Sequence, residues 1–291
     1  MTNNNGRLKL AIQKEGRLTV ETLEFLRKSG LEFDSFKQRL LSTCRNFPTE
    51  ILFVRANDIA EYVKDGTVDV GIVGQNLLYE RQAKVKKLLN LRFGFCQLIL
   101  AVPKESTIKN LSQLKGKKIA TSYPLSTKSF LKKNNINATV VVLSGSVEVA
   151  PLLGLGDAVV DLTSTGSTLT LNDLRMVEKI YDSEAVLIAN EAVIKDKEKK
   201  ILLKKLLLRF SGVLSAQKYK YVLMNAPEKI VPRLIKVIPG LKTPVVSSFA
   251  KNGGVSIATV IKEDAFWETV DRLQKIGVTG ITVLPIEKMI F

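Results

Sequence analysis

Histidine is absent from this chain of 291 residues. Its absence excludes the catalytic triads that pair histidine with serine or cysteine, metal sites built on imidazole, and acid–base catalysis by a histidine side chain. One missing residue type thus removes several large classes of enzyme mechanism.

Cysteine and long apolar runs are also scarce. The two cysteines, Cys44 and Cys96, do not form a CxxC pair, so neither a disulfide framework nor a thiolate metal site is indicated. No stretch reaches the roughly 18 consecutive apolar residues of a membrane span. The opening MTNNNGRLKL lacks the apolar core of a secretory signal. We expect a soluble, cytoplasmic protein with reduced cysteines and no membrane partner.

The balance of charge is strongly positive, with 44 Lys and Arg residues against 28 Asp and Glu residues and a formal net charge of +16. Such a surface attracts phosphate, either on nucleic acid or on a polyanionic small substrate. The lysines are scattered and lack the interleaved aromatics of a single-strand binding platform. We interpret them as solvated faces that also raise the local phosphate concentration, and we expect no nucleic-acid partner.

The order of apolar and polar segments indicates two α/β lobes. LKLAIQ, EILFVRA and VDVGIVG predict buried strands, and TVETLEFLRKSG and DIAEYVKDG predict helices, an alternation that favours a parallel sheet. A second lobe begins near residue 98, with helices expected around Leu111 and over SVEVAPLLGLGD. The chain then returns to the first lobe and continues as a long amphipathic helix within KDKEKKILLKKLLLRFSGVLSAQ, for which a membrane-surface helix is the alternative.

Beyond residue 218 the pattern changes to β-α-β-β-α-β. Phe266, Val270, Leu273 and Ile276 recur at helical spacing, so the last helix has an apolar face that can bury against a four-stranded antiparallel sheet. A Gly-Gly turn is expected in the hairpin between TPVVSSFA and VSIATVI. The predicted domains are a first lobe of residues 1–97 and 186–217, a second lobe of residues 98–185, and a ferredoxin-like domain of residues 218–291.

The sharpest local signal is the segment VVDLTSTGSTL at residues 159–169. An apolar strand stops at Asp161 and enters a hydroxyl-rich loop around Gly166, before a helix begins. Exposed backbone N–H groups and Ser/Thr hydroxyls can wrap a phosphate monoester there, and Gly166 permits its close approach. Asp161 can accept hydrogen bonds from ribose hydroxyls. The alternative is a Ser/Thr-rich helix cap and turn without a ligand.

Two common nucleotide motifs are missing. No GK[ST] follows a glycine at the spacing of a Walker A loop, and the LKGKK segment at 114–118 does not qualify. Gly154 and Gly156 do not begin a dinucleotide fingerprint, because the third position is Val159. Both of these nucleotide-binding folds are therefore disfavoured.

Several segments together resemble one enzyme family. LAIQKEGRL, RNFP, DVGIVG, SGSVEVAPLLGLGDAVVDLTSTGSTL and the terminal FWETVDRLQKIG with ITVLPIEKM look like ATP phosphoribosyltransferase, the first enzyme of histidine biosynthesis, in its long, self-regulated form. The match spans nearly the whole chain, although Glu15 and the pair Asn172-Asp173 depart from the family's usual residues. The resemblance implies an α/β core of two lobes, like a periplasmic binding protein, and a C-terminal ferredoxin-like (ACT-like) βαββαβ domain.

The resemblance also implies roles for individual residues, with Arg17 and Asp161 as catalytic residues. Those expected to bind phosphoribosyl pyrophosphate are Asp161, Ser164, Thr165, Gly166, Ser167, Thr168 and Leu169. Those expected to meet ATP or pyrophosphate are Lys14, Gly16, Arg17, Arg55, Asp58, Ser144, Gly145, Ser146 and Glu148. A solvated arginine at a helix start is the alternative for Arg17, and an ordinary helix-start carboxylate is the alternative for Glu148.

The reaction that the resemblance implies is displacement of pyrophosphate from ribose C1 by N1 of the adenine of ATP. N1 already carries a lone pair, so a strong base is dispensable, and the work lies in aligning two anionic substrates and stabilising the leaving pyrophosphate. Mg²⁺ is expected on the pyrophosphate, held mostly by substrate oxygens and water, with no protein ligand assigned.

Three other functions are considered: a periplasmic solute-binding protein, an inactive regulatory paralogue and a nucleic-acid binder. The phosphate-shaped loop opposes the first, the intact Asp161 loop and Arg17 oppose the second, and charge alone supports the third. By resemblance, the C-terminal domain binds histidine as an allosteric inhibitor and shifts a homo-oligomer, a dimer or hexamer, toward an inactive arrangement. Oligomerisation alone is the alternative. The histidine pocket is sought at Thr243 to Ser248 and Ser256 to Thr259.

Overall fold

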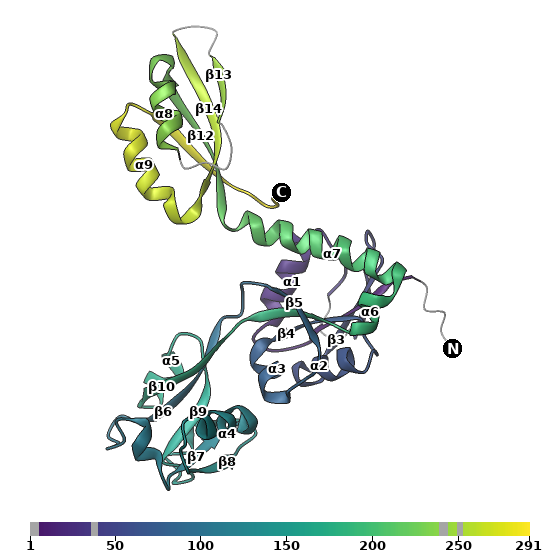
Figure 1. Ribbon diagram of the computed structural model, residues 1–291, viewed down its shortest axis with the longest axis vertical. Coiled ribbons are helices and arrows are strands. Elements are labelled where there is room, and N and C mark those ends of the chain that lie inside the picture. The colour runs from purple at the N-terminus through teal and green to yellow at the C-terminus, as the bar shows by residue number, and fades with distance from the viewer. Residues whose placement is uncertain (1–5, 36–39, 239–243, 249–252) are drawn as a thin grey trace. The chain divides into compact units, whose positions relative to one another are not determined.

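A computed structural model describes residues 6–35, 40–238, 244–248 and 253–291 (Figure 1). Contacts divide the chain into two compact units, one of residues 1–24 and 31–203 and the other of residues 25–30 and 204–291. The first unit holds a six-stranded and a five-stranded sheet, and the second holds a four-stranded sheet. The predicted α/β fold class is thereby confirmed, whereas the predicted three-domain boundaries stay a prediction.

The six-stranded sheet of the first lobe is mixed. Its strands in spatial order are β2 (Leu41–Thr43), β3 (Thr49–Val54), β1 (Leu8–Gln13), β4 (Val70–Gly74), β11 (Ala185–Ala189) and β5 (Lys86–Asn90). β1 is parallel to β3 and β4, whereas β2, β11 and β5 pair antiparallel. The three strands predicted to be parallel are so, and the sheet is mixed because further strands join it. Among these, β11 arrives directly from the second lobe without the crossover helix that parallel pairing requires.

Three helices follow the parallel strands of this sheet: α1 (Thr19–Lys28), α2 (Ala56–Lys64) and α3 (Gln75–Arg81). α2 buries Ile59, Ala60 and Val63, which share one helix face and pack with Ala11 and Val73 of the sheet. The periodicity of DIAEYVKDG therefore predicted this helix and its buried face correctly.

The five-stranded sheet of the second lobe orders as β10 (Leu174–Ser183), β6 (Cys96–Pro103), β9 (Ala158–Thr163), β7 (Lys118–Thr121) and β8 (Thr139–Val142). β7 is parallel to β8 and β9, and β6 pairs antiparallel with β9 and β10. Its helical elements are η1 (Leu111–Leu114), α4 (Pro124–Lys133), η2 (Val147–Val149) and α5 (Ser167–Leu171). The chain enters this lobe through β6 and leaves through β10, so two connections join the lobes (Figure 1).

Two helices expected in the second lobe are shorter than predicted. SVEVAPLLGLGD forms only the 3₁₀ turn η2 followed by further turns, because Pro151 has no N–H to donate back to Val147 in an α-helix. The helix around Leu111 is a single 3₁₀ turn of four residues, closed by a capping box between Asn110 and Gln113. Apolar spacing alone did not distinguish a full helix from one turn.

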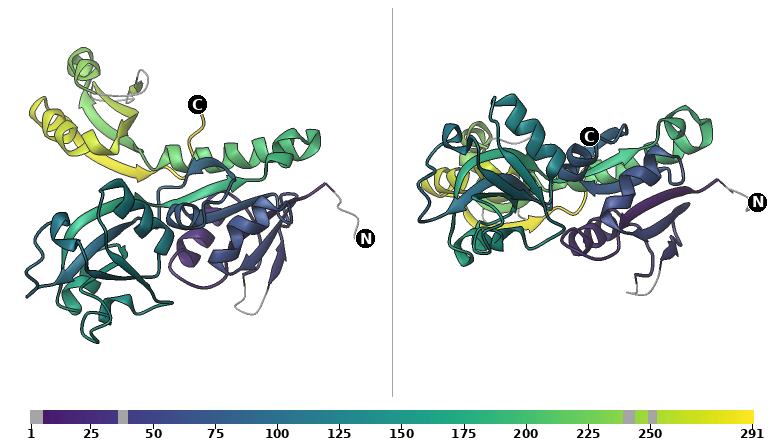
Figure 2. Two further views of the ribbon diagram at one scale, coloured as in Figure 1. Left: turned by 60° about the horizontal axis from the view of Figure 1, so that its bottom comes forward. Right: turned by 90° about the horizontal axis from the view of Figure 1, so that it is seen from below.

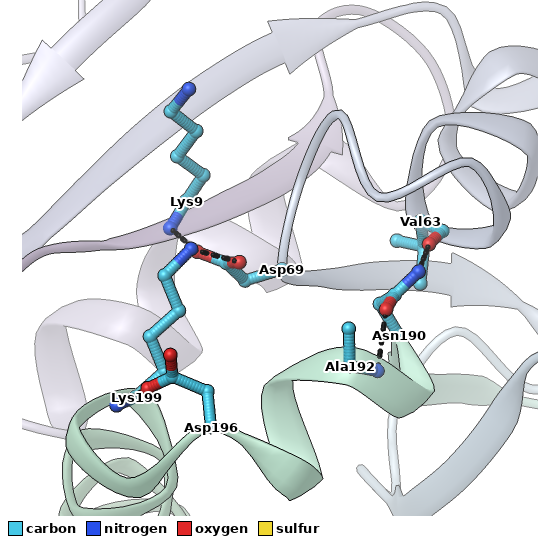
Figure 3. A network of polar contacts seen from close by, with 7 residues as sticks. All are labelled: Lys9, Val63, Asp69, Asn190, Ala192, Asp196 and Lys199. Atoms are coloured by element: carbon cyan, nitrogen blue, oxygen red, sulfur yellow. Dashed lines mark hydrogen bonds and ion pairs between the residues drawn. The ribbon is translucent and has the colours of Figure 1, made fainter. Parts of the chain in front are cut away.

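Two helices follow β11: α6 (Glu191–Lys195) and α7 (Lys197–Ala216). Asn190 caps α6 by accepting from Ala192 N–H at 2.7 Å, and its amide donates to Val63 O at 2.7 Å (Figure 3). Near the start of α7, Lys199 Nζ contacts the buried carboxylate of Asp69 at 2.8 Å. The second oxygen of Asp69 accepts from Lys9 N–H at 2.8 Å. These polar contacts fix the start of α6 against α2 and the start of α7 against Asp69, beside the first sheet.

The long amphipathic helix is confirmed as α7, with a break before it at Asp196. Leu206, Phe210 and Val213 are buried at helical spacing, and the Phe210 ring packs edge-on against Phe25 with centroids 4.9 Å apart. This apolar face is covered by protein, so the membrane-surface alternative loses its basis. In the described part of the chain, no helix combines the length and apolarity needed to span a membrane.

The C-terminal sheet orders as β13 (Val245–Ser248), β14 (Gly254–Lys262), β12 (Tyr219–Pro227) and β15 (Thr279–Pro285), all antiparallel. Its helical elements are η3 (Glu228–Ile230), α8 (Val231–Val237), η4 (Glu263–Ala265) and α9 (Phe266–Lys275). Leu234 of α8 and Leu273 of α9 pack with Val222 and Ile257 into one core, on one face of the sheet (Figures 1 and 2). The predicted βαββαβ order is confirmed.

Candidate functional site

Several side chains predicted to be functional lie where parallel strands end. In the first lobe, the loop after β1 carries Lys14, Gly16 and Arg17, and the segment after β3 carries Arg55. Lys14 N–H donates to Val54 O at 2.8 Å, which ties the two loops together. Parallel strands present their carboxyl ends at one edge, the usual place for ligands in open α/β sheets. This edge is therefore the candidate site in the first lobe.

The loop after β1 requires glycine at position 16. Gly16 has φ +127°, and a Cβ there would lie 2.0 Å from Nε2 of Gln13. Gln13 Nε2 donates to Glu15 O at 2.7 Å, so the turn is closed by a side chain from the end of β1. Lys14 is half-buried and Arg17 is exposed. The turn delivers the Arg17 guanidinium at the start of α1 with access to solvent and ligand.

Arg55 and Asp58 occupy the start of α2. Arg55 is the N-cap residue with extended backbone, and Asp58 N–H donates to Arg55 O at 3.0 Å. Arg55 is exposed and Asp58 is half-buried in the first helical turn, where a carboxylate opposes the helix dipole favourably. Both predicted residues thus lie at the same sheet edge as Lys14.

The hydroxyl-rich loop follows β9 directly. Gly166 has φ +78°, and its N–H donates to Thr163 Oγ1 at 2.9 Å. Thr165 Oγ1 and Ser167 Oγ form a hydrogen bond of 2.9 Å, and both residues, like Ser164, are exposed. A Cβ on Gly166 would meet nothing within 4 Å, so the loop is open on that side. The position of the Thr168 side chain lies outside what the structure describes, and Leu169 is half-buried.

Residues 144–148 follow β8 at the corresponding edge of the second lobe. Ser146 adopts a left-handed conformation with φ +48°, which turns the chain into η2. Ser144, Gly145 and Ser146 are exposed, whereas Glu148 is half-buried in η2. Ser144 lines a hollow together with Asn57 of α2, so the two lobes face each other here.

A cavity between the lobes brings several of these elements together. Gln13, Arg17 and Asn57 line it from the first lobe, and Tyr123 and Leu162 line it from the second. Asn76 of α3 completes the wall beside Tyr123. Arg17 and the β9 end are therefore two walls of one site, whereas Lys14 and Arg55 lie on the same edge without lining this cavity.

Electrostatics link Asp161 to both lobes. Burial raises the pKa of the Asp161 carboxyl above its ordinary value of 3.8, and the charge of Glu148 adds to the rise. The Leu162 N–H, which donates to Asp161 Oδ1 at 2.8 Å, and the Arg17 guanidinium lower the same pKa. The charges of Arg17 in the first lobe and Glu148 in the second, both predicted from the sequence, thus act on the Asp161 carboxyl.

Tyr123 is the cavity residue that sequence reasoning missed. Burial raises the pKa of its phenol to about 12, the charge of Asp161 adds to the rise, and Arg17 and a hydrogen bond to Asn76 oppose it. The hydroxyl is therefore neutral at physiological pH and can donate a hydrogen bond. The available signal was its place directly after the strand KIATS and before Pro124, the first residue of α4.

The donor set for a metal ion is small. Across the residues that the structure describes, no three Asp, Glu, Cys or His side chains form a group that could hold a metal ion. Asp161 and Glu148 supply two carboxylates whose charges influence each other. Two carboxylates fit Mg²⁺ that keeps most of its coordination shell as water and substrate phosphate oxygens.

In the C-terminal domain, the segments considered for histidine point in different directions. Val245, Val246, Ser247 and Ser248 are exposed, and Ser247 pairs with Ser256 across the hairpin. Thr259 is only 6% exposed and lies on the core face, while Thr243 lies outside the described residues. Because directly paired residues face the same side, Val246 and Ser248 lie on the same face as Thr259, whereas Ser247 and Ser256 lie on the opposite face.

Comparisons with known proteins match both parts of the chain. The family model for ATP phosphoribosyltransferase (HisG) matches residues 55–212, and that for the HisG C-terminal domain matches residues 216–288. An ATP phosphoribosyltransferase of Bacteroides thetaiotaomicron is 45% identical over 283 residues, 97% of this chain and 99% of that protein. One from Bacteroides fragilis is 46% identical over the same shares of both chains.

A solved structure resembles the larger part of the chain. It is the ATP phosphoribosyl transferase (HisG:HisZ) complex from Thermotoga maritima, with a TM-score of 0.60 and 29% sequence identity. The matched region covers 70% of this chain and 98% of that one. The present chain therefore extends well beyond the matched length.

Proposed function

This chain belongs to the ATP phosphoribosyltransferase family, the pentosyltransferases of histidine biosynthesis, and from that premise we propose the reaction, the site residues and the regulation described below. The proposed reaction transfers the phosphoribosyl group of phosphoribosyl pyrophosphate to N1 of ATP and releases pyrophosphate. The observation that carries the proposal is an interlobe cavity lined by Arg17, Tyr123 and Leu162, next to Asp161, whose pKa responds to the charges of Arg17 and Glu148.

Phosphoribosyl pyrophosphate binds at the end of β9. Asp161 accepts hydrogen bonds from the ribose hydroxyls, and the exposed hydroxyls of Ser164, Thr165 and Ser167 surround the 5-phosphate. Gly166 leaves room for the phosphate because no neighbour lies within 4 Å of its missing Cβ. Thr168 and Leu169 complete the loop by resemblance to the family signature.

ATP and the leaving pyrophosphate are met mainly by cations. Arg17 faces the cavity from the first lobe and can stabilise negative charge that develops as the pyrophosphate leaves ribose C1. Lys14 and Arg55 add positive charge along the same edge, and Gly16 shapes the turn. In the second lobe, the segment from Ser144 to Glu148 contacts ATP or pyrophosphate. In the first lobe, Asp58 contributes to the same binding from the start of α2.

The chemistry asks little of acid–base groups. N1 of adenine attacks with its own lone pair, the bond from C1 to the pyrophosphate oxygen breaks, and no proton needs to be removed before attack. Two highly anionic substrates must instead be held in line, so rate enhancement comes from orientation and fixed positive charge. Tyr123 offers a neutral hydroxyl beside the reacting groups.

Mg²⁺ is part of the proposal as a substrate-borne ion. It would neutralise charge on the pyrophosphate and be held mostly by substrate oxygens and water, so few protein ligands are expected.

The C-terminal domain is proposed as the histidine sensor. The Thermotoga maritima protein matches 70% of this chain and is described as part of a HisG:HisZ complex, whereas this chain adds its own HisG C-terminal domain. We propose that the domain binds histidine and inhibits transfer in a homo-oligomer, a dimer or hexamer, located in the cytoplasm like other enzymes of amino-acid biosynthesis. Such inhibition requires two global states with different affinity for histidine.

One assay tests both levels of the proposal. The purified protein is mixed with ATP, phosphoribosyl pyrophosphate and Mg²⁺, and phosphoribosyl-ATP is followed by its ultraviolet absorbance with and without free histidine. Turnover that histidine suppresses supports the enzyme and the sensor. Turnover that histidine does not suppress would contradict the proposed histidine sensor. Absence of turnover in several preparations would contradict the proposed reaction.

A further inference from the structure

A buried carboxylate joins the two lobes beside the candidate site. Glu80 of α3 is 8% exposed and belongs to the first lobe. Its Oε1 accepts from Leu125 N–H at 2.8 Å and its Oε2 accepts from Ser126 N–H at 2.9 Å. Leu125 and Ser126 are in the first turn of α4, in the second lobe. One side chain thus satisfies two N–H groups that a helix start leaves unpaired.

The same face of α3 also reaches Tyr123. Asn76 and Glu80 are four residues apart, so they lie on one face of the helix, and both are buried. Ser183 fixes the position of Asn76. The Asn76 backbone N–H donates to Ser183 Oγ at 2.9 Å, and Asn76 Oδ1 accepts from Ser183 Oγ at 3.2 Å. Its amide nitrogen remains to hydrogen-bond with the Tyr123 hydroxyl. α3 therefore contacts the Tyr123 hydroxyl through Asn76. It contacts α4, the helix that follows Tyr123, through Glu80.

Aromatic packing supports the same contact. Tyr79 of α3 packs edge-on against Tyr181 of β10 with ring centroids 4.8 Å apart. The Tyr181 hydroxyl lies 3.1 Å from Ser126 Oγ, one residue beyond Leu125. The first turn of α4 is thus fixed from α3 and from β10 together.

We propose that Glu80 is a positioning residue for the transferase reaction: by holding the first turn of α4, it keeps the Tyr123 hydroxyl in the interlobe cavity beside Asp161 and Arg17. Tyr123 is the N-cap residue of α4, one residue before Pro124. A shift of α4 relative to α3 would therefore move Tyr123 directly. The proposal rests on the proposed function, since it assigns Tyr123 to that site.

The chemistry of the contact explains why a carboxylate is needed. Two parallel N–H donors point at Glu80, and an ionised carboxylate accepts both while its charge opposes the helix dipole of α4. Glutamine has nearly the same shape but replaces one acceptor with an N–H₂ group, which would face an N–H donor. Glu80→Gln therefore breaks one bond of the pair and removes the charge without leaving a cavity.

The test is a double-mutant cycle in the full-length protein, with wild type, Glu80→Gln, Tyr123→Phe and the double variant. We expect each single variant to lower kcat by about 10- to 100-fold, because small displacements of reacting groups cost this much. The KM values for both substrates should change by less than about threefold, because the phosphate-binding loops are untouched. The double variant should be no slower than the slower single variant, because Glu80 acts through Tyr123.

Matched controls separate positioning from stability. Glu105→Gln, in an exposed turn of the second lobe, makes the same chemical change away from the site and should match wild type. Amide hydrogen exchange at Leu125 and Ser126 should accelerate in Glu80→Gln and not in Glu105→Gln. If Glu80→Gln does not fold, Glu80→Asp, which keeps the charge and shortens the reach, replaces it in the cycle.

Each outcome has a definite meaning. If the reductions in kcat of the two single variants multiply in the double variant, Glu80 does not act through Tyr123. A Glu80→Gln variant with wild-type kcat also overturns the role of Glu80. Either result leaves the proposed transferase reaction in place. A wild type that forms no phosphoribosyl-ATP overturns the proposed function instead. In that case unchanged exchange at Leu125 and Ser126 in Glu80→Gln would also overturn the contact itself.

Discussion

The surroundings of the Asp161 side chain disfavour the ionised form of its carboxyl group. Burial and the neighbouring Glu148 raise its pKa, so the ionised form is less favourable in the folded protein than in the unfolded chain. For a raised pKa in an acid, stability is fully present below the unfolded value and is lost as pH rises through the folded value. At neutral pH the folded protein therefore carries a penalty at this residue.

Asp161→Asn should stabilise the fold at neutral pH, because the amide carries no charge to desolvate. The melting temperature of the variant should exceed that of wild type at pH 7.5, and the difference should vanish as pH falls below about 4. Thermal unfolding across this pH range measures it. A variant that is less stable than wild type at pH 7.5 would contradict the assignment.

The same substitution should abolish most of the activity. The amide replaces one of the two acceptor oxygens with an N–H₂ group and removes the charge that strengthens bonds from the ribose hydroxyls, so kcat/KM for phosphoribosyl pyrophosphate should fall by about 100-fold or more. Steady-state kinetics with the exposed Asp264→Asn as control provide the measurement. Retained activity in Asp161→Asn would exclude Asp161 from the reaction.

Sequence reasoning found the charged residues of the site more readily than the neutral ones. Arg17 and Asp161 stand in short motifs that already suggest phosphate chemistry; Arg17 lines the interlobe cavity, and Asp161 precedes its wall residue Leu162. Glu80 stands in an ordinary helical context, and the local signal at Tyr123 is its place between the strand KIATS and Pro124. The contacts of Glu80 join residues 45 and 46 positions apart, which one sequence does not display.

At the scale of elements, the loop after β9 depends on a left-handed glycine. Gly166 and Gly116 have nearly equal φ values, +78° and +76°, and a Cβ on either would meet nothing within 4 Å. Alanine at either position should therefore cost a similar amount of stability, roughly 1 kcal/mol, from backbone strain alone. A comparison of the two alanine variants therefore separates the effect of backbone strain from any effect on phosphate binding.

Gly166→Ala should raise KM for phosphoribosyl pyrophosphate by about tenfold, because the methyl group and the strained loop both hinder close approach of the phosphate. Gly116→Ala should lower the melting temperature by a similar amount and leave KM unchanged. Kinetics and thermal unfolding of both variants provide the comparison. An equal rise of KM in both would mean that the loop holds no phosphate.

The contact between α7 and the first sheet depends on Asp69 and Lys199. Asp69→Ala removes a buried carboxylate that accepts from Lys199 Nζ and Lys9 N–H, and we expect a loss of about 2 kcal/mol in the free energy of unfolding. Asp182→Ala breaks the exposed pair with Lys179 and should cost well under 1 kcal/mol. Chemical denaturation measures both, and equal losses would contradict this assignment.

Element types were easier to predict than their pairing or length. Helical periodicity identified α2, α7 and α9, because a buried face repeats over two turns or more. The strand order was not accessible, since β11 pairs antiparallel with β4 only because the chain returns from a distant lobe. The helix predicted over the η2 segment does not form, because Pro151 interrupts the backbone hydrogen bonds that an α-helix there would need.

At the scale of the whole molecule, the net charge of +16 should act on substrate capture. Raising NaCl from about 0.05 to about 0.5 M shortens the screening length to a few ångströms, so KM for ATP and phosphoribosyl pyrophosphate should rise while kcat changes little. Initial rates across this range measure the effect, and excess duplex DNA should not inhibit at physiological salt. KM values insensitive to salt would show that the charge serves another purpose.

The candidate interlobe cavity is lined by Arg17 and Tyr123, and the chain contains no histidine. A ribosome that makes this protein therefore never waits for charged histidyl-tRNA. When free histidine is exhausted, translation slows on most messages but not for that reason on this one. A cell can thus continue to synthesise an enzyme of the pathway at the moment when the pathway's product is scarcest.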